Sequence, residues 1–295
     1  EKLSKHFGEI RAVDDVSLAV GRGEIYGFLG LNGAGKTTAI RMLLGMISPT
    51  SGTAYLFGNK VTPNSCDLWA RVGYMVETPH AYPDLTVQEN LEIIRRLRRL
   101  PDKKSVDKVI DELRLTPYRD RKARNLSSGN AQRLGLAKAL LHHPEVLILD
   151  EPANGLDPAG IVETWEMFSN LATSQDVTIF VSSHILGEIA KYATRIGIIH
   201  QGRLIQDVGA DQLEQLCYKK VVVDTLDNQA AQAQLIAQGY SIQLTEAGVL
   251  ESVGERAVNH PENIANILVQ AGIPLTLLKV EEEDLESYFL RVVKD

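Results

Sequence analysis

The sequence has no apolar segment long enough to cross a membrane. Its apolar runs, such as residues 146–149, have the length of a buried strand, whereas a bilayer-spanning helix needs about 18 or more consecutive apolar residues. The first residues lack the basic start, apolar middle and small-residue cleavage site of a signal peptide, and Glu1 is not an initiator methionine. We therefore expect a protein that is soluble by itself and located in the cytosol.

The sequence also has few cysteines, and it has fewer basic than acidic residues. Cys66 and Cys217 are far apart and show no CxxC or Cys/His spacing, which favours two separate thiols over a disulfide or a metal site. The net charge is -7, and residues 211–295 carry 14 acidic and 6 basic side chains against 24 and 25 in residues 1–210. Nucleic-acid binders usually present a basic face, so we expect no nucleic-acid partner.

The sequence contains enough apolar residues to form two hydrophobic cores. Hydrophobic residues make up 44% and charged residues 23%, enough to bury one large core and a second, smaller one. From Val13 onward, β-rich runs alternate with helical patterns, one starting near Lys36 and others within 86–115, which predicts an α/β fold with a mainly parallel sheet. We expect strands at 24–29, 53–57, 72–76, 146–149 and 177–181, and a closing hairpin at 196–200 and 203–206.

The pattern changes after about Gly209. The remaining residues favour the order β-α-β-β-α-β, which is the ferredoxin-like arrangement of a small α+β domain, and then a last amphipathic helix. The expected elements are a strand at 221–224, a helix at 230–237, a hairpin at 240–244 and 249–253, a helix at 261–270, a strand at 275–280 and a helix at 284–293.

A glycine-rich segment stands between the first predicted strand and the following helix. Residues 30–38 read Gly-Leu-Asn-Gly-Ala-Gly-Lys-Thr-Thr and fit the pattern GxxxxGK[ST]. Glycines let backbone N–H groups and the positive helix end face phosphates, while Lys36 reaches the β and γ phosphates and Thr37 offers a hydroxyl to Mg²⁺. An ordinary glycine-rich turn is the alternative, but Lys36 and Thr37 in register favour a nucleotide site.

Two acids end another predicted strand. Asp150 and Glu151 follow the apolar residues 146–149, and two carboxylates at a buried strand end need cations or protons. Beside a phosphate loop, Asp150 is suited to hold Mg²⁺ and Glu151 to act as general base toward water. Taken alone, such a pair is more often a strand leaving the core.

A third segment, residues 126–133, reads Leu-Ser-Ser-Gly-Asn-Ala-Gln-Arg and precedes an apolar helical run. Its small polar start suits a helix N-terminus that offers N–H groups and a hydroxyl to an anion. A plain capped helix explains the segment equally well when it is considered alone.

In this order, the motifs resemble those of the nucleotide-binding subunit of an ATP-binding cassette (ABC) transporter, over residues 1 to about 210. The matching segments are 30–38 (Walker A), 126–132 (signature), 146–151 (Walker B), 155–157 (D-loop) and Ser183-His184 (switch histidine). The resemblance implies a P-loop ATPase domain at 1–210 with a helical subdomain at about 78–140, and an accessory domain at 211–295.

The resemblance also implies cofactors, partners and site residues. ATP and Mg²⁺ are the cofactors, and the ATPase acts with a second copy of itself and a separate membrane permease at the cytoplasmic face of the membrane. Two copies pack head to tail, and His184 contacts the γ-phosphate, Asp157 links the two sites and Phe7 stacks on adenine, although Phe7 also suits a core position. The implied ATP-binding residues are Phe7, Asn32, Gly33, Ala34, Gly35, Lys36, Thr37, Thr38 and, from the other copy, Ser127 and Gly129.

The sequence departs from the family pattern at two places. The signature has Ser128 where the family usually has glycine and Asn130 where it usually has glutamine, yet it keeps Ser127 and Gly129. Glu77 stands at the position of the family's Q-loop glutamine, where a carboxylate can ligate Mg²⁺ or orient water beside Glu151 and His184. A glutamate there is similar to bacterial exporters of the bacitracin and lantibiotic self-immunity type.

Other interpretations remain open. Residues 95–99 and 119–124 are basic, and their arginines suit a permease-facing or lipid-facing surface as well as a solvated helix face. A cassette ATPase acting on nucleic acid or ribosomes usually carries a coiled coil, a zinc motif or a second cassette, which this sequence lacks, and Glu151 argues against a regulator without turnover. Residues 211–295 suit either a regulator of the dimer or a domain that only adds stability.

Overall fold

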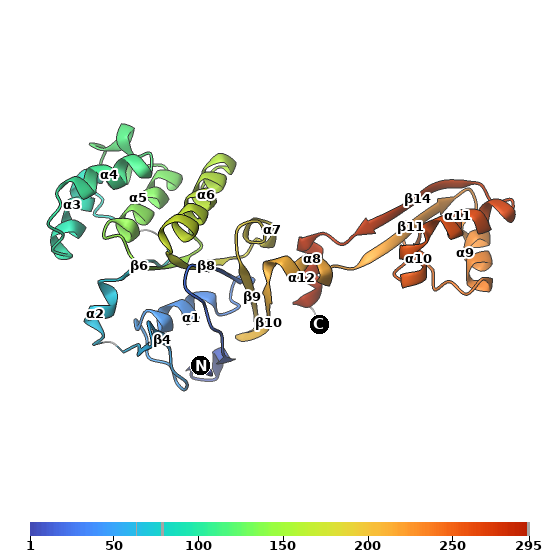
Figure 1. Cartoon of the computed structure of the whole chain (residues 1–295), viewed down its shortest axis with the longest axis horizontal. Helices are drawn as coiled ribbons and strands as arrows, with labels where there is room; N and C mark the ends of the chain where they lie inside the picture. Colours follow the sequence, from blue (N-terminus) through green and yellow to red (C-terminus); the bar gives the residue numbers. More distant parts are fainter. Residues whose placement is uncertain (63, 78–79, 294–295) are drawn as a thin grey trace. The chain divides into compact units, whose positions relative to one another are not determined.

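The chain folds into two compact units, each with its own core. The computed structural model describes residues 1–62, 64–77 and 80–293. The first unit is Glu1–Asp211 and the second is Gln212–Asp295. The colours of Figure 1 follow the sequence and so distinguish the two units. All the sequence motifs discussed above belong to the first unit.

A six-stranded sheet forms the centre of the first unit. Its strands are parallel to their neighbours except for the hairpin between β9 and β10. In spatial order they are β10 (Arg203–Gly209), β9 (Arg195–His200), β3 (Ile25–Leu29), β8 (Thr178–Ser183), β7 (Val146–Asp150) and β6 (Val72–Met75). The apolar runs of β3, β7 and β8 are buried on both faces, as expected for parallel strands covered by helices.

Helices occupy the connections between these strands. The α-helices are α1 (Lys36–Leu43) after β3, α2 (Cys66–Trp69) before β6, α3 (Val87–Leu97), α4 (Lys104–Glu112) and α5 (Ser128–Leu140) between β6 and β7, α6 (Pro158–Gln175) between β7 and β8, and α7 (Leu186–Ile189) before β9. Short 3-10 turns lie at η1 (Thr116–Tyr118), η2 (Ala123–Asn125) and η3 (Ala210–Gln212). Helices α3, α4 and α5 pack against one another (Figure 1), which gives a helical layer that interrupts the strand order.

Local sequence determines where some helices begin. Thr86 and Glu89 form a capping box at α3, because each side chain accepts the backbone N–H of the other residue. At α6 the Asp157 carboxylate accepts the N–H of Gly160 at 3.0 Å, and Pro158 occupies the first helical position. Such caps fix the start of the helix and contribute about 1 kcal/mol each.

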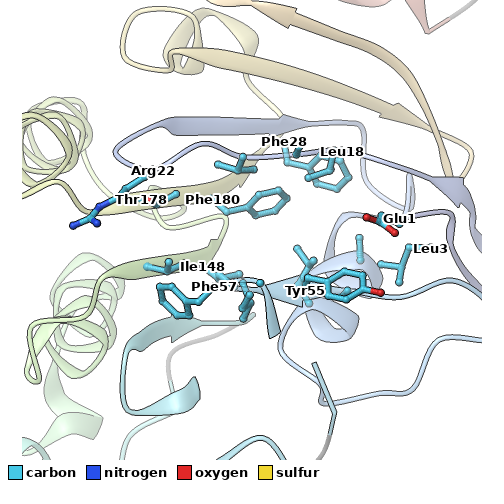
Figure 2. A pocket seen from close by; sticks show the side chains of 18 of the residues that line it. Glu1, Leu3, Leu18, Arg22, Phe28, Tyr55, Phe57, Ile148, Thr178 and Phe180 are labelled. Carbon is cyan, nitrogen blue, oxygen red and sulfur yellow. The ribbon is translucent and has the colours of Figure 1, made fainter. Parts of the chain in front are cut away.

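Two antiparallel strand pairs complete the first unit. They are β1 (Leu3–Phe7) with β2 (Ile10–Val16) and β4 (Tyr55–Leu56) with β5 (Asn59–Lys60). The first pair was not predicted from the sequence, because polar residues interrupt its apolar alternation. Figure 2 shows a cavity of about 500 Å³ in which Phe28 and Phe180 of the central sheet face Tyr55 and Phe57. Of the described residues that line this cavity, none belongs to residues 30–38.

The second unit has the antiparallel sheet order β12-β13-β11-β14. Its elements are α8 (Leu213–Leu216), β11 (Lys219–Thr225), α9 (Asn228–Ala237), β12 (Gln243–Leu244), β13 (Leu250–Ser252), α10 (Glu255–Asn259), α11 (Pro261–Gln270), β14 (Leu275–Glu282) and α12 (Leu285–Val292). This strand order is the ferredoxin-like arrangement that the sequence predicts. The short helix α10 was not predicted, and the hairpin strands β12 and β13 are shorter than expected.

The described residues include neither a membrane-crossing helix nor a metal-binding cluster of acidic, cysteine and histidine side chains. Over residues 1–62, 64–77 and 80–293, no helix combines the length and the apolar character that a bilayer span needs. Over the same residues, no three or more His, Cys, Asp or Glu side chains lie together in a way that could hold a metal ion.

Candidate active site

Residues 30–38 form the loop between β3 and the start of α1. Gly33 and Gly35 have φ values of 82° and 111°, in the left-handed region that glycine adopts without strain. A Cβ atom at Gly35 would lie 2.4 Å from the carbonyl oxygen of Ala12, so no other residue fits there. No side chain caps the first turn of α1, which leaves its N-terminal backbone N–H groups available to an anion.

Lys36 is held against its own loop. Its side chain is 6% exposed, and Nζ donates hydrogen bonds to the carbonyl oxygens of Gly30 at 2.6 Å and Leu31 at 3.3 Å. The same ammonium group lies 3.2 Å from Oε1 of Glu151. A buried ammonium needs such partners, so Lys36 is fixed between the loop and the carboxylate.

The two acids at the end of β7 lie beside this loop. Asp150 is 3% exposed, and its two carboxylate oxygens accept hydrogen bonds from the hydroxyls of Thr37 at 2.7 Å and Ser182 at 2.6 Å. Ser182 also accepts the backbone N–H of Glu151 at 3.0 Å. Glu151 has a φ of 50°, so the chain turns sharply after Asp150 and the two carboxylates reach different partners.

His184 completes a row of polar contacts along the same sheet edge. Its Nδ1 lies 2.8 Å from Oε2 of Glu151, whose Oε1 is buried, accepts no hydrogen bond and has Lys36 beside it. Because β3, β7 and β8 are parallel neighbours, the residues that follow them meet at one edge of the sheet. The sequence predicted Lys36, Asp150, Glu151 and His184 for one site, and the structure places them within this network.

Glu77 lies near the site but contacts another residue. Its carboxylate forms an ion pair with Arg41, which is four residues after Thr37 on α1 and therefore on the same helix face, about one turn away. Glu77 has a φ of 58°, and its side chain is about half exposed. Within the described residues, Glu77 has no hydrogen bond to Asp150 or Thr37; the neighbouring Thr78 and Pro79 lie outside those residues.

The signature segment is exposed and bonded mainly to its own surroundings. Ser127 caps α5 by accepting the N–H of Asn130 at 3.3 Å, and the hydroxyl of Ser128 donates to the carbonyl oxygen of Gly155 at 3.2 Å. The amide of Gln132 donates to the carbonyl oxygens of Glu151 at 3.1 Å and Pro152 at 2.8 Å. In the described part of the chain, no hydrogen bond or ion pair joins Ser127 or Gly129 to residues 30–38.

Of the remaining predicted ATP-binding residues, four belong to the loop itself and Phe7 lies on β1. Ala34 is buried and Thr38 is half-buried, whereas Asn32 and Gly33 are exposed at the tip of the loop. Phe7 ends β1 with 51% of its surface exposed, and the Lys5 ammonium lies 5.1 Å from the centre of its ring. Phe7 therefore does not occupy the core position that was the alternative for it.

Three residues of this region were missed from the sequence. Ser182 supports both Asp150 and Glu151, Gln132 links the signature helix to the carbonyl groups after β7, and Arg41 pairs with Glu77. Ser182 carried a usable signal, because it is polar at the end of the apolar strand that precedes His184. The other two act through partners distant in the sequence.

The basic segments form ion pairs within the chain. Arg95 and Arg96 both bind Glu92, and the two guanidinium groups hold the pKa of the Glu92 carboxyl at about 2. Arg124 pairs with Asp84 at 2.7 Å, and the Arg121 guanidinium lies 5.3 Å from the centre of the Tyr118 ring. The pair of Arg96, whose side chain is 73% exposed, favours the solvated-face interpretation for that residue. The Arg95 side chain is only 11% exposed and also donates to the carbonyl oxygen of Leu100, so it is held inside the fold.

A phosphate loop on the first turn of a helix, joined through Thr37 to the acid at the end of a neighbouring parallel strand, is the arrangement of P-loop ATPases. Comparison with known proteins agrees. The family model described as ABC transporter matches residues 13–154. The bacitracin transport ATP-binding proteins BcrA of Bacillus licheniformis and Enterococcus faecalis are each 38% identical to the chain, with 99% of this chain and 95% of each relative covered. The chain belongs to the ABC transporter family, as an ATP-hydrolysing subunit.

Solved structures give the same fold for the first unit. A structure titled as the ATP-binding subunit of an ABC transporter has a TM-score of 0.66 and 28% identity, covering 73% of this chain and 90% of that one. A dimeric ATP-binding cassette, MJ0796, bound to ADP and phosphate has a TM-score of 0.66 and 22% identity, covering 71% of this chain and 97% of that one. The second structure supports the fold alone, because its identity to the chain is low.

Proposed function

We propose that the chain hydrolyses ATP at residues 30–38 and the ends of β7 and β8 to drive a separate membrane permease that exports a drug, a peptide antibiotic or a lipid-like compound. The observation that carries this proposal is the contact row from Lys36 through Glu151 to His184. The exporter assignment is supported by full-length similarity to proteins named for bacitracin transport. As part of such a transporter, the chain acts at the cytoplasmic face of the membrane.

The ion pair between Lys36 and Glu151 suggests how binding prepares hydrolysis. A triphosphate offers Lys36 several charged oxygen atoms, so the ammonium group exchanges its carboxylate partner for phosphate. Oε1 of Glu151 then loses its cation and becomes able to accept a proton from the attacking water. Oε2 stays next to Nδ1 of His184, which holds the carboxylate in place and leaves the other ring nitrogen for the γ-phosphate.

The residues beside the loop fit a Mg²⁺ ion. The Thr37 hydroxyl and the Asp150 carboxylate lie 2.7 Å apart, and both are oxygen ligands of the kind that Mg²⁺ prefers. Thr37 and Asp150 would hold the ion, which would supply positive charge to the transferring phosphate. Glu77 is the further candidate, and it must first leave Arg41.

We also propose that two copies of the chain form each site. Ser127 and Gly129 are accessible, and Ser127 sits at the N-terminus of the 13-residue helix α5, where backbone N–H groups favour an anion. Among the described residues, no hydrogen bond or ion pair joins them to their own phosphate loop, and the proposal assigns the phosphate that they bind to another copy. Gly155, shortly after β7, accepts the Ser128 hydroxyl of the signature, and Asp157 caps the start of α6.

A groove on the first unit suits the permease contact. It is lined by Met46, Trp69, Tyr74, Arg98 and Leu100, among others, and has a volume of about 540 Å³. Met46 and Tyr74 are 47% and 42% exposed, an unusual amount for large apolar side chains that lie together. Tyr74 is three residues before Glu77, which pairs with Arg41 of α1. A permease segment in this groove would therefore contact the chain close to Glu77.

Measuring magnesium-dependent ATP binding and turnover tests the proposal. We expect Lys36→Ala to lose about 2 kcal/mol or more of binding energy, or at least about 30-fold in affinity, because a buried cation that serves phosphate is removed. Lys60→Ala, on the exposed strand β5, is the matched control and should behave as the wild type. Undiminished affinity and turnover in Lys36→Ala would overturn the proposal.

A further inference from the structure

A small cavity is lined in part by Glu151 and His184, the proposed catalytic pair. Its volume is about 130 Å³, enough for several water molecules at about 30 Å³ each. Its walls come from the residues after β7, from the end of β8, from α6 and from α7. The side chains in these walls that matter for the argument are Glu151, Trp165, Ser182, His184 and Glu188.

Trp165 is a fixed part of this cavity. The residue is 1% exposed, and its ring is stacked on Tyr192 at 5.6 Å and meets the edge of Phe168 at 5.8 Å between ring centres. Its Nε1–H is buried and has no hydrogen-bond acceptor within bonding geometry among the described residues. A buried donor without an acceptor is unfavourable, so an acceptor that can reach it is favoured.

Glu188 is the candidate acceptor, because it lines the same cavity as Trp165. It lies on α7 four residues after His184. Burial raises the pKa of its carboxyl, and the nearby Trp165 N–H lowers it by less. His184 and Lys191 also lower the pKa, and Glu151 raises it. A small rotation of the side chain, or one water in the cavity, brings the carboxyl oxygen and the indole N–H together.

Helix α7 depends on packing for its position. It has only four residues, Leu186–Ile189, and no side-chain cap, and its buried Leu186 and Ile189 hold it on the core side. His184 stands two residues before it, with Nδ1 on Glu151. Any displacement of α7 therefore moves the imidazole relative to the carboxylate, and displacements of about 1 Å in an active site lower rates strongly.

We propose that Glu188 is a positioning residue for ATP hydrolysis, which accepts the Trp165 N–H across this cavity and so holds α7 with His184 against Glu151. The inference rests on the roles proposed above for Glu151 and His184. Glu188 acts as a hydrogen-bond acceptor, and its negative charge is not required.

Three variants test whether Glu188 acts as a hydrogen-bond acceptor for Trp165. Glu188→Gln keeps a side-chain oxygen that can accept the indole N–H, Glu188→Leu removes the acceptor at similar size, and Trp165→Phe removes the donor while keeping an aromatic ring. Glu166→Leu, on the exposed face of α6, is the matched control. We expect about tenfold lower kcat in Glu188→Leu and Trp165→Phe with KM for ATP unchanged, and near wild-type kcat in Glu188→Gln and the control. The double variant should be no slower than the slower single variant.

A spectroscopic measurement keeps the test decisive if a variant loses stability. The ¹⁵N signal of the His184 imidazole in the ATP-free full chain should change in Glu188→Leu and stay unchanged in Glu188→Gln. Wild-type kcat in both Glu188→Leu and Trp165→Phe, an equal loss in Glu188→Gln and Glu188→Leu, or an unchanged His184 signal in Glu188→Leu would overturn the inference. A Glu151→Gln variant in the same assay reports on the proposed function separately, because its turnover depends on Glu151 whatever Glu188 does.

Discussion

The phosphate-loop half of the site and the signature half differ in how much of their chemistry is already paired. Lys36, Thr37, Asp150, Glu151 and His184 are joined by hydrogen bonds and an ion pair across three parallel strands. In the signature half, Ser127 is exposed and bonded locally, and Gly129 is partly exposed. The difference fits the proposal that the phosphate-loop half is complete in one chain and the signature half serves another copy.

The two halves are nevertheless connected within one chain. Gln132 of the signature helix donates to the carbonyl oxygens of Glu151 and Pro152, and Ser128 donates to that of Gly155. In the proposed dimer, a phosphate bound at the signature of one copy would therefore act on the segment that carries Glu151, the proposed general base, in the same copy. This contact would give the two sites a physical route to affect each other.

The largest effect is expected from the catalytic half. Glu151→Gln should lower kcat by about 10²–10⁴-fold with ATP still bound, because an amide cannot take a proton from water. Steady-state ATPase assays and equilibrium binding measure the two quantities. Glu145→Gln, an exposed acid beside the start of β7, is the control and should hydrolyse ATP normally. Turnover of Glu151→Gln at the wild-type rate would remove Glu151 from the mechanism.

A smaller effect is expected from the binding half. Gly129→Asp fits sterically, because an added Cβ would meet its nearest neighbours at 3.5 Å, but it places a negative charge where a phosphate is proposed to bind. Turnover should fall about 100-fold while ATP binding to one chain is unchanged, since like charges placed together cost several kcal/mol. Gly254→Asp in the second unit, where an added Cβ would also meet its nearest neighbour at 3.5 Å and φ is not positive, is the control. Normal turnover in Gly129→Asp would contradict the proposal that the signature half binds a phosphate.

Arg41 and Glu77 should show a weaker and state-dependent coupling. In a double-mutant cycle with Arg41→Met and Glu77→Gln, thermal unfolding without ATP should give a coupling of about 0.2–1 kcal/mol, because both side chains are partly exposed. With magnesium and ATP, the coupling should disappear if Glu77 turns to the metal. A coupling of the same size in both states would show that Glu77 stays on Arg41.

The smallest effect concerns His142, which belongs to neither half. Burial, with Arg98 nearby, lowers the pKa of His142 to about 4, so the folded chain binds its proton less readily than the unfolded chain. Its contribution to stability is therefore complete above about pH 6.5 and is lost as the pH falls toward about 4. Calorimetry should show that His142→Gln loses about 2–4 °C less in Tm than the wild type between pH 7 and pH 5, after allowing for the partial exposure of the ring. An identical pH dependence of Tm in both proteins would contradict the assignment.

Much of the site could be predicted from the sequence because its chemistry is local. Lys36 and Thr37 stand in one motif at a strand-to-helix junction, and Asp150 and Glu151 directly follow an apolar run. Together these two motifs predict that the four residues share one site. The strands 146–149 and 177–181 were predicted nearly to their ends for the same reason, since parallel strands buried on both faces are continuous apolar runs.

The parts of the site and fold that could not be predicted depend on contacts between residues distant in the sequence. Arg41 and Glu77 are 36 residues apart and Ser182 and Asp150 are 32 apart, and no local pattern announces such pairs. The strands β1 and β2 were missed because Lys5, His6, Arg11 and Asp14 interrupt their alternation. The roles of Phe7, Ser127, Gly129 and Glu77 remain predictions, as they depend on a nucleotide and a second copy.

Sedimentation of the Glu151→Gln variant with magnesium and ATP tests most directly whether two copies share each site. Because hydrolysis is blocked, we expect a species with twice the mass of one chain, formed only with ATP. The same variant carrying Gly129→Asp should bind ATP and stay at the mass of one chain. A doubled mass in both variants, or a mass that ATP does not change in Glu151→Gln, would contradict the account.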